Sequence, residues 1–122
     1  MKYAVLDTNF ILSCIRKKID FFTEIPQMGL KILIPLQVLD ELRKFSRQGR
    51  GNLKQEAKLA LTILENQEFQ RIDLYERNVD NGLIKLAEKN RNYIIGTLDT
   101  EIKRKTRSSV LVIRGEKQLE II

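Results

Sequence analysis

The chain has 122 residues, 43% hydrophobic and 31% charged, which is typical of a globular protein with one buried core. Its 22 lysines and arginines outnumber its 16 acidic residues. The resulting charge of +6 favours a polyanionic partner, nucleic acid before membrane, although the same charge also serves solubility. The absence of histidine excludes Ser-His and Cys-His nucleophiles and imidazole zinc sites, and a single cysteine excludes an internal disulfide.

The chain shows no sign of membrane targeting. No apolar run approaches the ~20 residues that span a bilayer. Asp7 interrupts the N-terminal segment too early for the apolar region of a signal peptide. We therefore expect one domain over residues 1–122, located in the cytoplasm and without a membrane partner.

The first predicted strand, residues 3–6, ends directly at Asp7. A helix is expected from residue 10 to 16. In an open α/β sheet, ligands and catalytic groups collect at the carboxyl ends of the strands, so Asp7 occupies the place of a working carboxylate. Asp, Thr and Asn are also good helix N-caps, and from Asp7-Thr8-Asn9 alone the cap is the better supported interpretation.

A second carboxylate is predicted after the next strand. Asp20 is placed to cap a short helix that ends at Gly29, a strand is expected at 31–34, and a helix at 36–46. Helical spacing puts Glu41 beside the apolar face of Val38 and Phe45. A buried glutamate is costly unless it is paired or bound to a metal; the alternatives are a solvent-reaching edge residue or a salt bridge.

Asp80 is the third candidate. The next elements are a helix at 53–66, a strand at 69–74 and a helix at 78–90. Asp80 leans toward the apolar side of the last helix, one turn before Leu83. Its alternative role is a first-turn acid that complements the helix dipole.

The fourth acid, Asp99, again follows a buried strand, residues 93–97. A short basic helix at 102–105 and a strand at 109–113 come next, and the tail at 116–122 is suited to an edge strand or a cover. The alternation of strands and helices predicts an α/β fold. It is a three-layer α/β/α sandwich around a mainly parallel sheet, with right-handed crossovers.

The four acids have one shared explanation. Strand ends in a parallel sheet meet at the same edge, so Asp7, Glu41, Asp80 and Asp99 are expected together. Packed carboxylates repel one another unless some stay protonated, and a hard divalent cation removes that conflict. Oxygen ligands without histidine suit Mg²⁺ or Mn²⁺, and we assign Asp7, Asp80 and Asp99 as the metal ligands.

Carboxylate-bound metal beside basic residues is an arrangement that cleaves phosphodiesters. The first candidates for holding RNA phosphates follow Asp99 closely: Lys103, Arg104, Lys105 and Arg107. A weaker second patch comprises Arg43, Lys44, Arg47, Arg50 and Lys54. The alternative for both runs is an ordinary solvated face.

Four segments carry a family resemblance: Val5-Leu6-Asp7-Thr8-Asn9, Val38-Leu39-Asp40-Glu41-Leu42, Asp80 with Leu83 and Ala87, and Thr97-Leu98-Asp99. In this order and spacing they resemble the PIN domain family over nearly the whole chain. The resemblance implies a five-stranded parallel sheet and an acidic metal site in which Asn9 and Thr97 support the four acids. It also implies an Mg²⁺- or Mn²⁺-dependent ribonuclease, often a homodimer. Many such proteins are VapC-type toxins held by an antitoxin, and others process ribosomal RNA.

The sequence leaves three functional hypotheses open. The first is a metal-dependent endoribonuclease, either a toxin or an rRNA-processing enzyme. The second is a non-catalytic RNA-binding module that keeps the acids for metal-linked stability. The third, a phosphoacceptor receiver domain, ranks last because it needs an acid pair after the first strand and a lysine after the last, where this chain has Thr8-Asn9 and Arg114.

Overall fold

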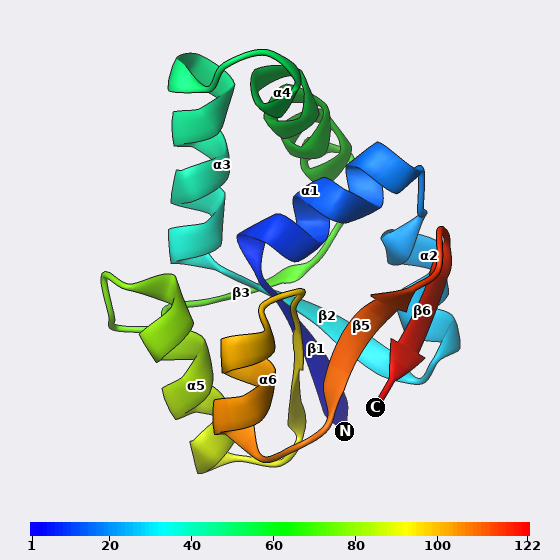
Figure 1. Cartoon of the computed structure of the whole chain (residues 1–122), viewed down its shortest axis with the longest axis vertical. Coiled ribbons are helices and arrows are strands. Elements are labelled where there is room, and N and C mark those ends of the chain that lie inside the picture. Colours follow the sequence, from blue (N-terminus) through cyan, green and yellow to red (C-terminus); the bar gives the residue numbers. More distant parts are fainter.

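The computed structural model describes residues 1–122 as a six-stranded sheet with helices on both faces (Figure 1). The strands are β1 (Lys2–Leu6), β2 (Leu30–Pro35), β3 (Gln70–Ile72), β4 (Tyr93–Gly96), β5 (Val110–Arg114) and β6 (Gln118–Ile121). Their order is β3-β2-β1-β4-β5-β6, and only the β5–β6 pair is antiparallel. The mainly parallel α/β/α fold is confirmed. The sheet has six strands rather than five because the C-terminal tail pairs with β5.

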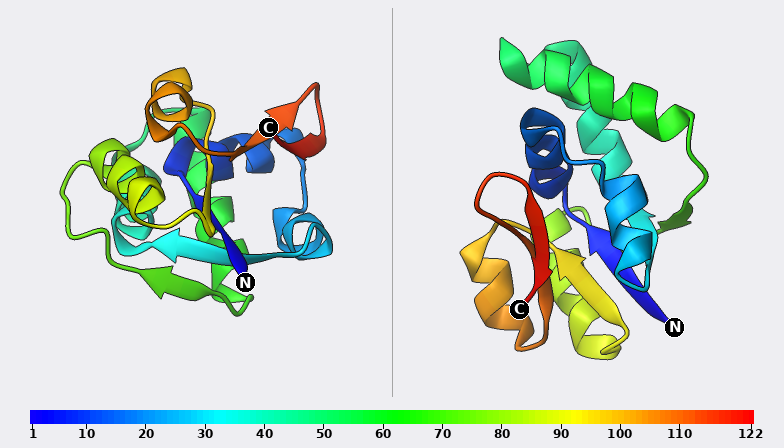
Figure 2. Two further views of the ribbon diagram at one scale, coloured as in Figure 1. Left: turned by 90° about the horizontal axis from the view of Figure 1, so that it is seen from below. Right: turned by 90° about the vertical axis from the view of Figure 1, so that its right-hand side faces the viewer.

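The helices lie on both faces of the sheet and beyond the carboxyl ends of its strands. They are α1 (Thr8–Lys17), α2 (Phe21–Gln27), α3 (Leu36–Gln48), α4 (Asn52–Glu65), α5 (Val79–Lys89) and α6 (Thr100–Thr106). Figure 2 shows α2 on one side of the sheet and α5 with α6 on the other, and Figure 1 shows α3 and α4 standing beyond the carboxyl ends of the strands, where α4 packs against α3 and α1. No helix here combines the length and apolar character needed to cross a membrane.

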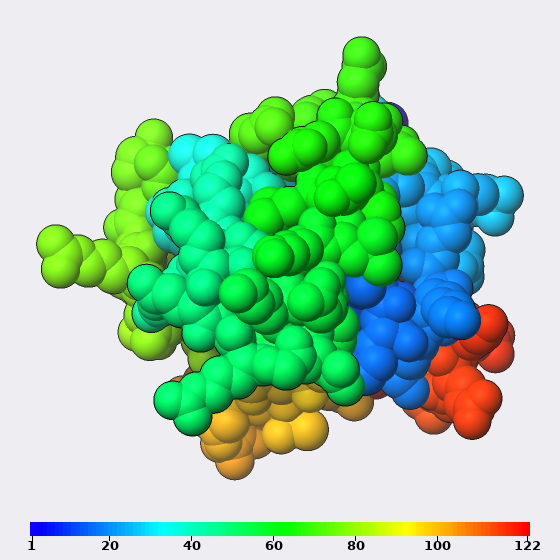
Figure 3. Space-filling view, turned by 90° about the horizontal axis from the view of Figure 1, so that it is seen from above, coloured from blue at the N-terminus to red at the C-terminus, as the bar shows by residue number.

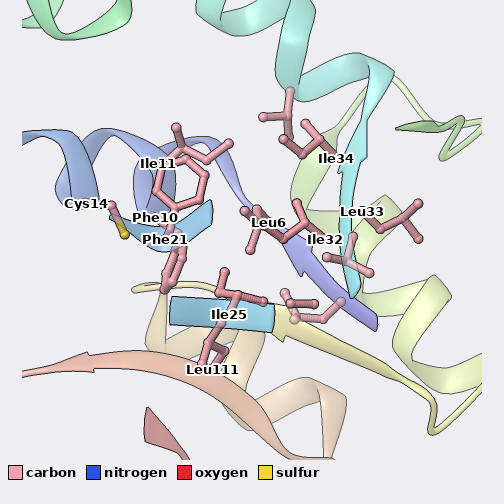
Figure 4. Packing of buried hydrophobic residues seen from close by; sticks show 14 of the residues in the cluster. Leu6, Phe10, Ile11, Cys14, Phe21, Ile25, Ile32, Leu33, Ile34 and Leu111 are labelled. Atoms are coloured by element: carbon pink, nitrogen blue, oxygen red, sulfur yellow. The ribbon is translucent and has the colours of Figure 1, made fainter. Parts of the chain in front are cut away.

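The core is one cluster of 28 buried hydrophobic residues between the sheet and its helices. Figure 4 shows Phe10 of α1, Phe21 and Ile25 of α2, and Leu111 of β5 gathered beside the central strands. All four side chains are almost fully removed from water. Burial of side chains this large contributes on the order of 1.5–3 kcal/mol each, so the core holds the strand ends in fixed positions.

The sheet changes its direction of winding between β1 and β4, which are hydrogen-bonded neighbours. From β1 the chain continues to β2 on one side, whereas from β4 it continues to β5 on the other. Such a switch leaves a crevice outside the carboxyl ends of the two strands, where ligands bind in open α/β sheets. Asp7 follows β1 directly and Thr97 follows β4 directly, so both lie at this switch.

Candidate functional site

Asp7 is both a helix cap and a buried carboxylate at the sheet edge. It is 5% exposed and is the N-cap of α1. Its Oδ1 accepts the Thr8 backbone N–H at 2.8 Å, and its Oδ2 accepts the Thr97 hydroxyl at 3.1 Å. Burial raises the pKa of Asp7 from 3.8 to about 6, and the charges of Asp80 and Glu41 act in the same direction against the two hydrogen bonds.

Thr97 joins the ends of β1 and β4. Besides donating to Asp7, its hydroxyl oxygen accepts the Asp99 backbone N–H at 3.0 Å. Asp99 in turn caps α6, because its Oδ1 accepts the Glu101 backbone N–H at 2.9 Å. Through the Thr97 hydroxyl, hydrogen bonds therefore connect the Asp7 carboxylate to the backbone of Asp99.

Glu41 is half-buried on α3 and faces the start of α1. The Thr8 hydroxyl donates a hydrogen bond to Glu41 Oε1. The preceding acid, Asp40, is exposed and pairs with Arg43 at 3.1 Å, so the two neighbouring acids point to different surroundings as the helical spacing predicts. The role of Thr8 was missed because nothing in the sequence relates a hydroxyl at position 8 to an acid 33 residues away.

Asp80 is more exposed than its helical position predicts. It stands in the first turn of α5, and the residue is exposed. Helical spacing predicts that Asp80 leans toward the apolar side of this helix, and the residue lines the same cleft as Asp7 and Glu41, although it is exposed there. Partial desolvation and the charge of Asp99 nevertheless raise its pKa, which places its carboxyl near the other acids.

A cleft of about 360 Å³ collects three of the four acids, Asp7, Glu41 and Asp80. Asn9, exposed on the first turn of α1, also lines it, and its side chain makes no hydrogen bond to the protein. Asp99 lines a neighbouring cavity of about 340 Å³ together with Thr97 and Lys103. Figure 1 shows why the acids approach one another: the first turns of α1, α3, α5 and α6 surround the same edge of the sheet.

The acids form neighbouring pairs rather than one closed ligand set, and no three of them lie close enough to hold a single metal ion. The donors are nonetheless all oxygens, and one of them is a buried carboxylate whose ionisation is opposed by its neighbours. This chemistry fits a hard divalent cation. The Asp80 carboxylate accepts no hydrogen bond from the protein, so no contact fixes its orientation.

The basic residues beyond Asp99 are not all free. Arg104 and Lys105 pair with Glu101 at 2.6 and 3.6 Å. Lys103 and Arg107 are exposed and make no ion pair, and Lys103 lies beside Asp99. Arg77 lines the acidic cleft and was not among the predicted site residues. A basic residue just before a helix start was the only signal for it.

A family model described as a PIN like domain matches residues 4–116. The chain belongs to this PIN-like family. The four acids occupy the sheet edge that the family resemblance assigned to them, and their roles stay a proposal.

Curated relatives of this PIN-like chain include two archaeal ribonucleases. Ribonuclease VapC4 of Methanocaldococcus jannaschii is 31% identical over 99% of this chain and 97% of its own length. Ribonuclease VapC9 of Archaeoglobus fulgidus is 34% identical over 88% of this chain and 77% of its own length. The rRNA-processing protein fcf1 of Schizosaccharomyces pombe is 26% identical, and the chain covers 53% of that protein.

A solved structure also resembles this PIN-like chain. The structure of the PIN domain endonuclease Utp24 superimposes with a TM-score of 0.78 over 98% of this chain and 90% of that one. At 23% identity this match shows the fold. It supports the mainly parallel sheet and its flanking helices.

Proposed function

We propose that this chain is a divalent-metal-dependent endoribonuclease that hydrolyses phosphodiester bonds of RNA. The observation that carries the proposal is the buried Asp7 carboxylate, held by Thr8 and Thr97 beside Glu41 and Asp80 at the switch point of the sheet. The proposal is also supported by two relatives, 31% and 34% identical to this chain, that are named ribonucleases.

Asp7, Asp80 and Asp99 would hold Mg²⁺ or Mn²⁺, and Glu41 completes the acidic set. Such an ion, when bound, lowers the pKa of a coordinated water and neutralises charge at the scissile phosphate. Thr97 positions Asp7, and Thr8 positions Glu41, through the hydrogen bonds they donate. Arg77 on the cleft wall and Lys103 beside Asp99 supply positive charge for the phosphate backbone.

The subfamily proposal is a VapC-type toxin, since the two relatives at the higher identities carry that name. The rRNA-processing alternative rests on the match to fcf1 at 26% identity. An antitoxin partner, a homodimer and a cytoplasmic location stay predictions.

The test is cleavage of total RNA with Mn²⁺ by the wild type and by Asp7→Asn. Asparagine is an equally good N-cap, so we expect an unchanged fold with cleavage reduced on the order of 10³-fold, because the carboxylate charge is lost. EDTA should have the same effect on the wild type.

The matched control is Asp20→Asn. Asp20 is the N-cap of α2, its carboxylate accepts the Thr23 backbone N–H at 3.3 Å, and it lies outside the cleft. This variant should cleave like the wild type. Cleavage that survives in Asp7→Asn or in EDTA contradicts the proposal.

A further inference from the structure

A second groove, of about 610 Å³, adjoins the acidic cleft. It lies between α3 and the segment from Asp73 to Asn78 that connects β3 to α5. Glu41, Arg77 and Val79 line both hollows, so the groove and the cleft are continuous. In Figure 3 this segment, yellow-green, projects from the molecule beside α3. We call it the Tyr75 groove.

Tyr75 presents an unusually bare aromatic ring on the wall of this groove. The residue is 86% exposed, whereas the other two tyrosines, Tyr3 and Tyr93, are half-buried and pack against each other with centroids 5.8 Å apart. The backbone at Tyr75 has φ 54°, a left-handed conformation that is uncommon for a bulky residue. A ring held outward in this way is available to a flat ligand.

The segment carrying Tyr75 is fixed to the opposite wall of the groove. Asp73 Oδ1 accepts the Tyr75 backbone N–H at 2.8 Å and the Gln37 side-chain amide at 2.7 Å. Gln37, on α3, also accepts the Leu74 backbone N–H at 3.1 Å. These hydrogen bonds lower the pKa of Asp73, so its charge persists and the tether holds at neutral pH. The ring is thus presented by a pre-organised segment.

Two of the four acids that line the groove are ion-paired, and its two cations are not. Asp40 pairs with Arg43 at 3.1 Å, and Glu76 pairs with Lys85 at 2.6 Å. Lys44 and Arg77 line the groove and make neither an ion pair nor a side-chain hydrogen bond. Unpaired cations beside a bare aromatic ring are the combination that binds single-stranded nucleic acid without sequence readout.

We propose that the Tyr75 groove is a subsite for single-stranded RNA next to the acidic cleft. Tyr75 stacks on one base, and Lys44 and Arg77 contact phosphates on the strand that continues past Glu41. The inference rests on the proposed function for its ligand class. Because Tyr75 binds a flanking nucleotide, its removal should raise KM and leave kcat nearly unchanged.

The first experiment measures binding of a fluorescent single-stranded RNA oligonucleotide by anisotropy in EDTA, where the proposed cleavage is blocked. Tyr75→Ala should bind about tenfold more weakly, the size of one base–aromatic stack, and Tyr75→Phe should stay within about twofold of the wild type. Leu59→Ala is the matched control, since Leu59 is a large side chain, 51% exposed, on α4 outside the groove. Equal affinity of Tyr75→Ala and the wild type overturns the inference.

A second variant reports the stack directly. The chain contains no tryptophan, so Tyr75→Trp introduces a single reporter that keeps an aromatic face. RNA should bind this variant with nearly wild-type affinity and quench its emission. Binding seen by anisotropy without any change in tryptophan emission contradicts stacking at this position.

The cations are tested by Lys44→Gln and Arg77→Gln against Lys58→Gln, an exposed lysine of α4 outside the groove. Lys44→Gln and Arg77→Gln should each bind RNA more weakly, and the salt dependence of their affinity should fall by the amount expected for one lost phosphate contact. The Lys58→Gln control should show neither change. A wild-type protein that binds RNA through Tyr75 but fails to cut it with Mn²⁺ would refute the proposed function alone. A protein that cuts RNA with the same KM in Tyr75→Ala would refute the subsite alone.

Discussion

The site has a buried half and an open half, and the fold controls them differently. In the buried half, Asp7 is 5% exposed and both of its oxygens accept hydrogen bonds from the chain. In the open half, Asp80 is exposed without a hydrogen-bond partner, and Asp99 uses one oxygen to cap α6. The buried half is fixed by the core, whereas the open half can adjust to what binds.

The two halves therefore differ in the free-energy cost of carrying negative charge. Burial opposes the negative charge of Asp7, so ionisation of this carboxyl group destabilises the folded state. Asp80 is exposed and Asp99 is half-buried, so their charges cost less than that of Asp7. If the proposed cation binds, relief of this cost at Asp7 favours its binding, and the less constrained carboxylates of Asp80 and Asp99 are the ones free to adjust to it.

The largest expected effect is a pH dependence of stability that Asp7 causes. Its pKa is raised from 3.8 to about 6, so the folded state holds a proton that the unfolded state releases in this interval. The contribution is fully present below pH 3.8 and is lost as the pH rises through 6, with an upper value of about 3 kcal/mol. Urea unfolding in EDTA measures this effect. Between pH 4 and pH 7, the free energy of unfolding of Asp7→Asn should increase relative to that of the wild type by about 1–3 kcal/mol.

Asp80→Asn serves as the comparison for this measurement. Asp80 is exposed, so its replacement should change the same curve far less than Asp7→Asn does. A difference between wild type and Asp7→Asn that is flat with pH would show that the Asp7 carboxylate is not destabilised by the fold.

The next effect concerns Thr97, which connects the two halves. Thr97→Val removes the hydrogen bond to Asp7 and leaves the Asp99 N–H without its acceptor, at a residue only 1% exposed. We expect the free energy of unfolding at pH 7 in EDTA to fall by about 2 kcal/mol, the size of a buried hydrogen bond to a charged group. Because that bond lowers the pKa of Asp7, the midpoint of the pH dependence should also move upward.

Thr97→Ser keeps the hydroxyl and is the matched control. It should retain the wild-type midpoint with a small loss from the missing methyl group. A midpoint that shifts equally in both variants would indicate a packing effect instead of the hydrogen bond.

Sequence patterns identified the parts of the site that follow from local rules. Asp7 and Asp99 were found because each follows a buried strand, and Glu41 because helical spacing turns it inward beside an outward Asp40. Strand ends of a parallel sheet meet at one edge whatever their exact order, so these positions required no knowledge of tertiary contacts.

The remaining features depend on contacts between distant segments. The hydrogen bond from Thr8 to Glu41 and the exposure of Asp80 follow from how α1, α3 and α5 are packed, which periodicity does not describe. The sixth strand was the least determined element. Residues 118–121 are short and partly polar, and they become a strand because β5 offers a free edge.

The smallest expected effect lies in the open half, at Asp99. This residue caps α6 through the Glu101 N–H at 2.9 Å, and its charge raises the pKa of Asp80. Asp99→Asn keeps the cap and removes the repulsion, so the free energy of unfolding should change by less than about 0.5 kcal/mol, whereas Asp99→Ala loses the cap and about 1 kcal/mol. In NMR titrations the pKa of Asp80 should fall in both variants. An Asp99→Asn variant as destabilised as Asp99→Ala would mean that the carboxylate charge, rather than the cap, stabilises this half, and the contrast with Asp7 would then disappear.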